Sequence, residues 1–311
     1  MNTIKVRVEA TRLLTPVVRE FTLTAVHGRL PKFSSGSHIQ VRLPLDERPL
    51  RNAYSLLGDP ANASSYRIAV RKQEDSRGGS VFMHERVREG SALKITPPAN
   101  LFALHSGARA HILIAGGIGI TPFVAHIAAL ERDAADFELH YAYRQGLTDA
   151  YRAELSERLG NRFHGYDGER VRLDIERVLR GRPLGTHVYV CGPQTLLRAV
   201  RETARALGWP DGRVHWEAFA ATQPGTPFVV TLMRSGARLD VAADQSLLEA
   251  LEASGLEIPN LCRGGVCGQC ATRHVAGDVD HRDLVLQESE RVTHLMPCVS
   301  RAHSTSLFLD L

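Results

Sequence analysis

The stretch of sequence that decides the fold is Cys262-Arg263-Gly264-Gly265-Val266-Cys267-Gly268-Gln269-Cys270. It spaces three cysteines as Cys-x4-Cys-x2-Cys, and Cys298 follows after residues 271–297. Glycines between these cysteines allow the backbone to wrap closely, so that its N–H groups can point at the sulfur atoms. The pattern predicts that four thiolates surround one small centre.

This spacing is typical of a plant-type [2Fe–2S] ferredoxin, in which three thiolates come from one loop and the fourth comes from a later strand. We therefore expect Cys262, Cys267, Cys270 and Cys298 to ligate a [2Fe–2S] cluster. Two alternatives stay open. Structural zinc typically binds short cysteine pairs, and a disulfide framework is usual in shorter, cysteine-rich chains.

Composition limits the classes of function. The chain has 311 residues, 43% of them hydrophobic, which suggests two or three domains. A net charge of +4 predicts neither a nucleic-acid partner nor a polybasic membrane segment. Only five cysteines occur, as expected in a reducing cytosol. Residues 110–130 are apolar enough to imitate a membrane helix, but Pro122 and several glycines interrupt them. We expect a soluble, cytoplasmic monomer without a signal peptide or membrane contact.

The predicted fold class is multidomain α+β. Residues 1–104 alternate apolar and polar positions in short runs that turn residues separate, which predicts an antiparallel β-barrel. The expected barrel strands are 5–8, 21–24, 38–43 and 66–71.

Strands alternate with helices over residues 105–222, which predicts an α/β domain with a parallel sheet of the nucleotide-binding kind. The expected strands are 110–115, 137–143 and 188–191, and the expected helices are 122–132, 151–159 and 196–207.

Residues 223–227 have the composition of a linker. Residues 228–311 then predict a C-terminal β-grasp ferredoxin domain, with strands at 228–232 and 238–241 and a helix at 246–254 before the cysteine loop.

Two segments of the predicted barrel suit a flavin. In Arg51-Asn52-Ala53-Tyr54-Ser55, the guanidinium can pair with a phosphate, Tyr54 can pack on the flavin and Ser55 can hydrogen-bond near its reactive nitrogen. Arg77-Gly78-Gly79-Ser80 precedes a predicted helix and offers backbone N–H groups and a hydroxyl to an anion. A barrel strand with a surface arginine and an ordinary glycine turn are the alternatives.

Two turns of the α/β domain suit a dinucleotide. Gly116-Gly117-Ile118-Gly119-Ile120-Thr121-Pro122 follows a buried strand and begins a helix, and Cys191-Gly192-Pro193 follows another buried strand. Both should lie at the carboxyl ends of parallel strands, where such sheets bind ligands. A buried, inert thiol is the alternative role for Cys191.

In these motifs and their order, the chain resembles the phthalate dioxygenase reductase family of the ferredoxin–NADP reductase superfamily. The resemblance implies FMN and NADH as cofactors. It places Thr121, Glu217 and Phe219 at the flavin, and it implies a structural role for His281-Arg282-Asp283. The family's Arg-x-Tyr-Ser motif occurs here with one extra residue. The NADH path is implied at Gly117, Gly119, Cys191, Gly192 and Pro193, with Ser55, Thr121 and Cys191 as the groups that frame the hydride transfer.

The resemblance implies that electrons leave for a Rieske-type oxygenase of an aromatic dioxygenase or demethylase system, and Arg263 is a candidate docking residue. A cytochrome P450 or another hydroxylase is an alternative acceptor, and a non-enzymatic redox sensor is an alternative function. Arg144 and Arg152 follow the second strand of the α/β domain and keep NADPH open as the donor.

Overall fold

The computed structural model describes residues 3–45, 50–62, 64–73, 77–219 and 223–311. The chain forms two compact units, Met1–Phe219 and Ala220–Leu311. The first unit therefore contains both the predicted barrel and the predicted α/β domain, and the second contains the cysteine loop.

The first part of this unit is an antiparallel sheet in the order β4-β3-β6-β1-β2-β5, with β7 paired to β3. The two ends of this path meet where Leu57, just after β4, pairs with Arg67 of β5. The sheet thus curls back on itself, as the predicted barrel requires. Its strands are β1 (Ile4–Thr15), β2 (Val18–Ala25), β3 (Ser37–Leu43), β4 (Leu50–Ser55), β5 (Tyr66–Arg71), β6 (Ala92–Ile95) and β7 (Ala99–Asn100).

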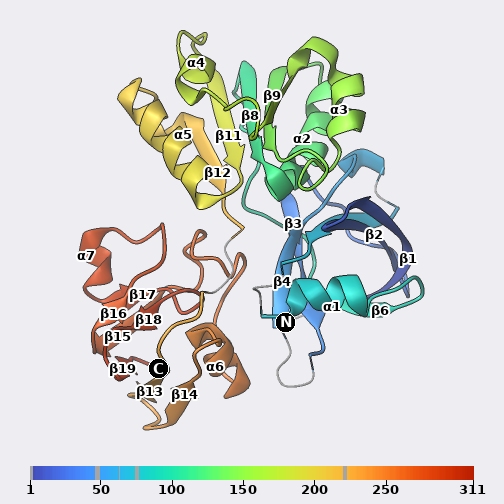
Figure 1. Ribbon diagram of the computed structural model, residues 1–311. Coiled ribbons are helices and arrows are strands. Elements are labelled where there is room, and N and C mark those ends of the chain that lie inside the picture. The colour runs from blue at the N-terminus through green and yellow to red at the C-terminus, as the bar shows by residue number, and fades with distance from the viewer. Residues whose placement is uncertain (1–2, 46–49, 63, 74–76, 220–222) are drawn as a thin grey trace. The chain divides into compact units, whose positions relative to one another are not determined.

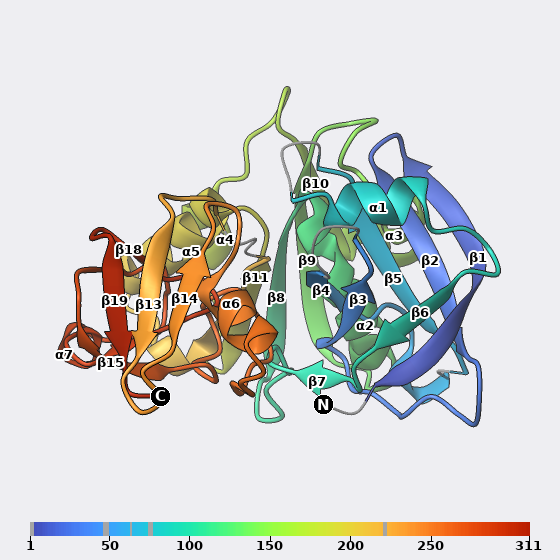
Figure 2. The same cartoon turned by 90° about the horizontal axis from the view of Figure 1, so that it is seen from below.

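The barrel core follows from the period-two pattern, because alternate side chains of each strand face one side. Val6 and Val8 of β1, together with Phe21 and Leu23 of β2, are buried in one cluster. The short helix α1 (Gly79–Glu85) contacts β4 (Figure 1) and β5 (Figure 2) and adds Met83 to this cluster.

The second part is a parallel sheet in the order β10-β9-β8-β11-β12. Helices α2 and α3 cover one face, and α4 and α5 cover the other (Figure 1), which confirms the α/β prediction. The described residues contain no helix long and apolar enough to span a membrane. The elements are β8 (Ala110–Gly116), α2 (Thr121–Arg132), β9 (Asp136–Tyr143), α3 (Arg152–Leu159), β10 (Phe163–Asp167), α4 (Ile175–Leu179), β11 (Thr186–Cys191), α5 (Gln194–Ala206) and β12 (Val214–Glu217).

Barrel and parallel sheet share one hydrophobic core, in which Val18 and Ala69 of the barrel pack with Phe123 of α2. Polar contacts reinforce this junction. The Tyr151 hydroxyl donates to Glu20 Oε2 at 2.6 Å, and the Thr15 hydroxyl donates to the Leu147 carbonyl at 2.8 Å. The two parts are therefore held together as one body, seen from below in Figure 2.

The second unit is a mixed sheet in the order β14-β13-β19-β15-β17, with a separate β16–β18 pair. The β13–β19 pair is parallel, and Leu247 and Leu251 of α6 pack with the buried side chains of this sheet, as in a β-grasp fold. The elements are β13 (Phe228–Leu232), β14 (Arg238–Val241), α6 (Leu247–Ala253), β15 (Thr272–Ala276), β16 (Val279–Asp280), α7 (Glu288–Arg291), β17 (His294–Leu295), β18 (Arg301–Ala302) and β19 (Ser306–Leu309).

The predicted linker 223–227 makes hydrogen bonds within the second unit. Gly225 N–H donates to the Ala243 carbonyl at 2.9 Å, and the Arg301 guanidinium donates to the Thr226 carbonyl at 3.0 Å. Residues 220–222, which end the predicted α/β domain, lie outside the described residues.

Candidate functional site

Residues 262–270, called the cluster loop below, bring their cysteines together with Cys298. The Cys270 and Cys298 sulfur atoms lie 3.3 Å apart, and Gly264 N–H donates to Cys262 Sγ at 3.3 Å. A hydrogen bond between Cys262 and Cys267 lowers the pKa of Cys267 and raises that of Cys262, while backbone N–H groups lower the pKa of both. Sulfur atoms gathered this closely, with backbone N–H groups directed at them, fit the ligation of iron.

The backbone of the cluster loop is left-handed at three residues, with φ of 52° at Arg263, 72° at Gly265 and 75° at Gly268. At Gly265 a Cβ atom would lie 2.6 Å from Val299 Cγ2, so only glycine fits there. These turns close the loop around its sulfur atoms.

The prediction that Arg263 is a docking residue is wrong. Arg263 is only 9% exposed, and its guanidinium donates to both carboxylate oxygens of Glu252, at 2.8 and 3.0 Å. It also donates to Asn260 Oδ1 at 3.2 Å. Burial and a bidentate ion pair turn this side chain into an anchor between the cluster loop and α6.

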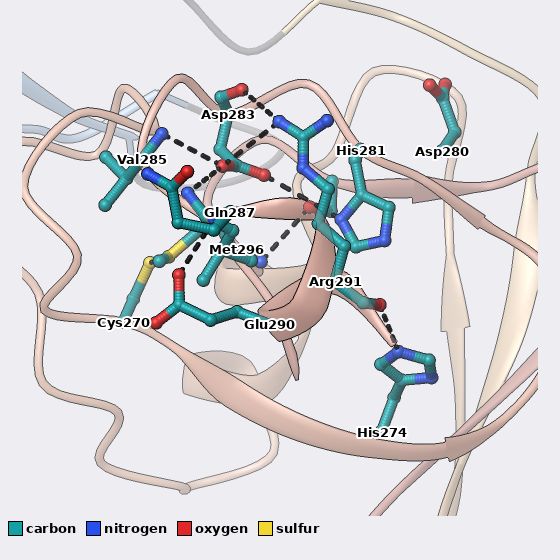
Figure 3. Close-up of polar contacts among 12 residues, drawn as sticks. Cys270, His274, Asp280, His281, Asp283, Val285, Gln287, Glu290, Arg291 and Met296 are labelled. Carbon is teal, nitrogen blue, oxygen red and sulfur yellow. Dashed lines mark hydrogen bonds and ion pairs between the residues drawn. The ribbon is translucent and has the colours of Figure 1, made fainter. Parts of the chain in front are cut away.

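Asp283 supports the cluster loop from the other side. Its buried carboxylate accepts N–H bonds from Val285 and Leu286 at 3.1 and 2.8 Å, and Arg291 donates to its carbonyl at 3.0 Å (Figure 3). The next residue, Leu284, donates its N–H to the Gly265 carbonyl at 3.0 Å. These contacts agree with the structural role predicted for His281-Arg282-Asp283.

In the first unit, the carboxyl ends of β8 and β11 bring two turns together, residues 116–119 and 191–193, called the glycine turns below. These strands are parallel neighbours, with Ala115 opposite Cys191. A Cβ atom on Gly119 would lie 2.2 Å from the Cys191 carbonyl oxygen. The absence of a side chain thus permits the contact, and both turns lie at the predicted edge of the sheet.

Buried polar groups gather around this edge. Glu217 lies opposite Cys191 in the β11–β12 register, and its Oε2 has no hydrogen-bond partner among the described residues. Burial raises the pKa of Glu217 to about 8, and burial also raises the pKa of the Cys191 thiol. Burial thus disfavours the charged form of both groups, while Phe219, two residues after Glu217, is 43% exposed.

Ser55 and Thr121 are also buried in the first unit, at 4% and 2% exposure. The Ser55 hydroxyl has no partner among the described residues, whereas Thr121 Oγ1 donates to the Ile118 carbonyl at 3.0 Å. A buried hydroxyl without a partner is rare in folded proteins, and it fits a bound group that supplies one.

Strand β4 separates the predicted flavin residues into two sets. Its pairing with β3 is regular, so Tyr54 and Asn52 share one face and Arg51 lies on the other. Asn52 Nδ2 donates to the Tyr54 hydroxyl at 3.2 Å, and a Cβ atom on Gly79 would lie 2.5 Å from Asn52 Nδ2. Asn52, which the sequence analysis did not select, therefore lies between Tyr54 and the Arg77–Ser80 turn.

The Arg77–Ser80 turn leads into α1, which begins at Gly79, two residues before the predicted start near Val81, and its N-cap Gly78 has a φ of 84°. Its Ser80 hydroxyl accepts from Gln73 N–H at 3.1 Å, which fixes the turn against the end of β5. Arg77 and Gly78 are half-buried, and Gly79 is buried.

Of the two arginines considered for a 2′-phosphate, Arg152 pairs with Asp149 at 3.4 Å and lies over the Tyr143 ring. Arg144 is exposed just after β9, and its backbone N–H donates to Thr148 Oγ1 at 2.9 Å.

Two family models match the chain. Residues 230–303 match the 2Fe-2S iron-sulfur cluster binding domain, and residues 91–214 match the N-terminal domain of the dimethylamine monooxygenase subunit DmmA-like proteins. The first match contains all four predicted cluster ligands.

Known proteins resemble the whole chain. It is 58% identical over 306 residues to the heme-dependent oxidative N-demethylase beta subunit of Ectopseudomonas mendocina, covering 98% of each. It is 38% identical to phthalate dioxygenase reductase of Burkholderia cepacia, over 94% of this chain and 92% of the relative. A solved phthalate dioxygenase reductase, described as a modular structure for electron transfer from pyridine nucleotides to [2Fe-2S], matches with a TM-score of 0.89 and 34% identity, covering 100% and 98% of the two chains.

Fold, sites and matches together define an oxidoreductase with an iron–sulfur domain. The chain belongs to the phthalate dioxygenase reductase family, which confirms the predicted resemblance and fold class. Because all five cysteines are free and the ferredoxin model covers the four ligands, the disulfide and zinc alternatives are dropped.

Proposed function

We propose that this protein takes electrons from NADH and delivers them, through bound FMN and a [2Fe–2S] cluster, to an oxygenase component. One chain combines three features, and this combination supports the proposal. Its barrel has a buried Ser55 hydroxyl without a partner among the described residues, its glycine turns are in close contact, and its C-terminal part has the cysteines of a ferredoxin. Flavin supplies the required chemistry because it exchanges two electrons with a nicotinamide and single electrons with an iron–sulfur cluster.

The FMN would be held by groups from the barrel and from the parallel sheet. Tyr54 and Ser55 come from the barrel wall, and Thr121, Glu217 and Phe219 come from the sheet edge. The Arg77–Ser80 turn offers cationic and backbone N–H groups to the phosphate. Asn52 shares the face of Tyr54 and is the candidate for the polar contact beside it, whereas Arg51 shares the opposite face of β4 with Ser55.

The nicotinamide nucleotide would lie on the glycine turns, along Gly117, Gly119 and residues 191–193. Burial disfavours the charged forms of Cys191 and Glu217, and an edge with little negative charge suits a neutral reduced ring. Ser55, Thr121 and Cys191 would orient the ring that gives up the hydride. No side chain is assigned as a general acid, because hydride transfer needs none.

The cluster would be held by Cys262, Cys267, Cys270 and Cys298. Backbone N–H groups of the cluster loop, such as that of Gly264, point at the sulfurs, and the loop is held by the Arg263–Glu252 pair and by the bond from Leu284 to Gly265. This part of the chain supplies a rigid, pre-formed set of ligands.

Two classes of acceptor remain for the oxygenase. The family resemblance favours a Rieske-type oxygenase, as in the aromatic systems of its dioxygenase reductase relatives. The identity of 58% to a heme-dependent N-demethylase subunit, against 38% to phthalate dioxygenase reductase, favours a haem-dependent demethylase. Reduction rates with one purified acceptor of each class decide between them.

The test of the core proposal is an anaerobic NADH titration followed by visible absorption and electron paramagnetic resonance, with the flavin extracted and identified. We expect flavin bleaching, a rhombic reduced-cluster signal and FMN in the extract. Absence of bleaching in protein with full iron content would overturn the proposal. A kcat/KM higher for NADPH than for NADH would overturn the choice of donor, and elution of a dimer in gel filtration would overturn the predicted monomer.

A further inference from the structure

Three potential metal ligands lie side by side on two neighbouring strands of the parallel sheet, apart from every residue assigned above to a cofactor. Glu138 and His140 occupy alternate positions of β9, so both side chains extend from the same face. His164 of the edge strand β10 pairs in register with His140. One ligand atom from each of the three residues lies within 4.8 Å of the others.

The two histidines differ in their exposure to solvent. His140 is buried at 4% exposure, whereas His164 is half-buried and open to solvent on one side. Their rings stack with centroids 4.7 Å apart. The pair therefore offers one fixed imidazole and one that can adjust towards an incoming ion.

Hydrogen bonds around the group fix its orientation. His140 Nδ1 lies 2.9 Å from the Tyr166 hydroxyl, and His140 Nε2 lies 2.8 Å from Glu138 Oε1. Without an ion, Nε2–H donates to the carboxylate and Nδ1 accepts from the Tyr166 hydroxyl. A metal ion would replace the Nε2 proton, which leaves to solvent, and Nδ1–H would then donate to Tyr166. Protein metal sites commonly have this arrangement, in which the second nitrogen of a ligating imidazole is tied to a polar partner.

Arg182 forms an ion pair with the Glu138 carboxylate. A guanidinium beside the carboxylate weakens the attraction of this site for a cation. Arg182 and His140 Nε2 both contact Oε1, so the guanidinium holds the carboxylate in place and Oε2 is the oxygen left to coordinate the ion. The affinity is therefore expected to be moderate.

We propose that Glu138, His140 and His164 bind one divalent transition metal ion, with Zn²⁺ as the ion of choice. Two imidazoles and one carboxylate form a ligand set that Zn²⁺ takes with a fourth position left to water. The bound ion would clip the edge strand β10 to β9, and edge strands need such protection from unpaired backbone groups.

The test is isothermal titration calorimetry of the iron- and flavin-loaded protein with ZnCl₂, followed by zinc-edge X-ray absorption of the complex. We expect one ion per chain and a first shell of nitrogen and oxygen only. His164→Ala and Glu138→Gln should each weaken binding at least about tenfold, and Tyr166→Phe should weaken it by a smaller factor. His303→Ala is the matched control, because His303 is exposed and lies in the other unit.

Three results would overturn the proposal: no binding by the wild-type protein, sulfur in the zinc shell, or equal affinity in His164→Ala, Glu138→Gln and His303→Ala. Sulfur would place the ion on the cysteines. Circular dichroism of each variant separates loss of the ligand from loss of the fold, and Glu138→Gln keeps the test valid if His164→Ala unfolds.

Discussion

The cluster loop and the glycine turns both bring binding residues together, but the first does so within one segment and the second with two segments that are distant in the sequence. The cluster loop contains three of the four cluster ligands, and its Arg263 and Gly265 are held by bonds to Glu252 and Leu284. The glycine turns belong to segments more than 70 residues apart (116–119 and 191–193), and they meet because β8 and β11 are parallel neighbours. A local site tolerates changes elsewhere in the chain, whereas an assembled site depends on the packing of the sheet.

The largest effect is expected from Cys298→Ser, which removes the one ligand that lies outside the cluster loop. Since the cluster needs four thiolates, iron, acid-labile sulfide and the reduced-cluster signal should all be lost. Flavin reduction by NADH should persist, because it depends on the first unit. Iron and sulfide analysis measures the loss of the cluster, and anaerobic NADH titration measures flavin reduction.

Cys191→Ser is the matched control for that experiment. It changes a buried cysteine of the assembled site and should leave the iron and sulfide content at the wild-type level. Full cluster content in Cys298→Ser would contradict the ligand assignment.

Next in size is Arg263→Met, which tests the anchor of the cluster loop. The substitution removes the guanidinium that forms a bidentate ion pair with the Glu252 carboxylate, and this pair is largely shielded from solvent. Breaking a buried pair from one side costs about 3–5 kcal/mol, so unfolding of the second unit should need much less urea. Loss of cluster absorbance reports the transition.

For comparison, Arg234→Met removes an exposed ion pair with Asp310 in the same unit and should change stability by less than about 1 kcal/mol. Equal urea midpoints for Arg263→Met and Arg234→Met would show that the loop does not depend on this anchor.

Gly119→Ala tests the assembled site. Its Cβ atom would meet the Cys191 carbonyl at 2.2 Å, a backbone contact that cannot be relieved by a side-chain rotation. Overpacking typically costs about 1–3 kcal/mol, and a backbone clash this close should lie at the upper end of that range. The same change should slow flavin reduction by NADH. Urea unfolding can be followed by tryptophan fluorescence, because both tryptophans, Trp209 and Trp216, lie in the first unit.

Gly212→Ala provides the control for Gly119→Ala, since nothing lies within 4 Å of the added carbon. Wild-type stability and reduction rate in Gly119→Ala would mean that the two turns do not need their close contact.

Much of the fold could be predicted because period-two strands and strand–turn–helix units leave local signals. The helices at 122–132 and 196–207 were placed within two residues of α2 and α5. Two-residue strands such as β17 and β18 were missed, since their pairing partners are distant and two residues carry no periodic pattern.

For the sites, spacing predicted the cysteines and strand context predicted the glycine turns. The role of Arg263 could not be predicted, because it depends on an ion pair with Glu252 of α6. A loop separates the two residues in the sequence, and no local pattern shows that they meet. Strand alternation did contain the signal that Asn52, and not Arg51, shares a face with Tyr54. Applying the period of two from Tyr54 backwards would have found it.

The smallest effect per unit of change is a pH slope that concerns Glu217, a half-buried residue of the assembled site whose Oε2 is enclosed. Burial raises the pKa of Glu217 in the folded protein from 4.5 to about 8. Between pH 4.5 and pH 8, the folded protein therefore keeps a proton that the unfolded chain has lost. Stability of the first unit should therefore fall as pH rises from 4.5 to 8, by at most about 1.4 kcal/mol per pH unit. Glu217→Gln cannot ionise and should remove this slope. Urea titrations at several pH values compare the two proteins, and parallel pH profiles would show that Glu217 is already ionised in the folded state.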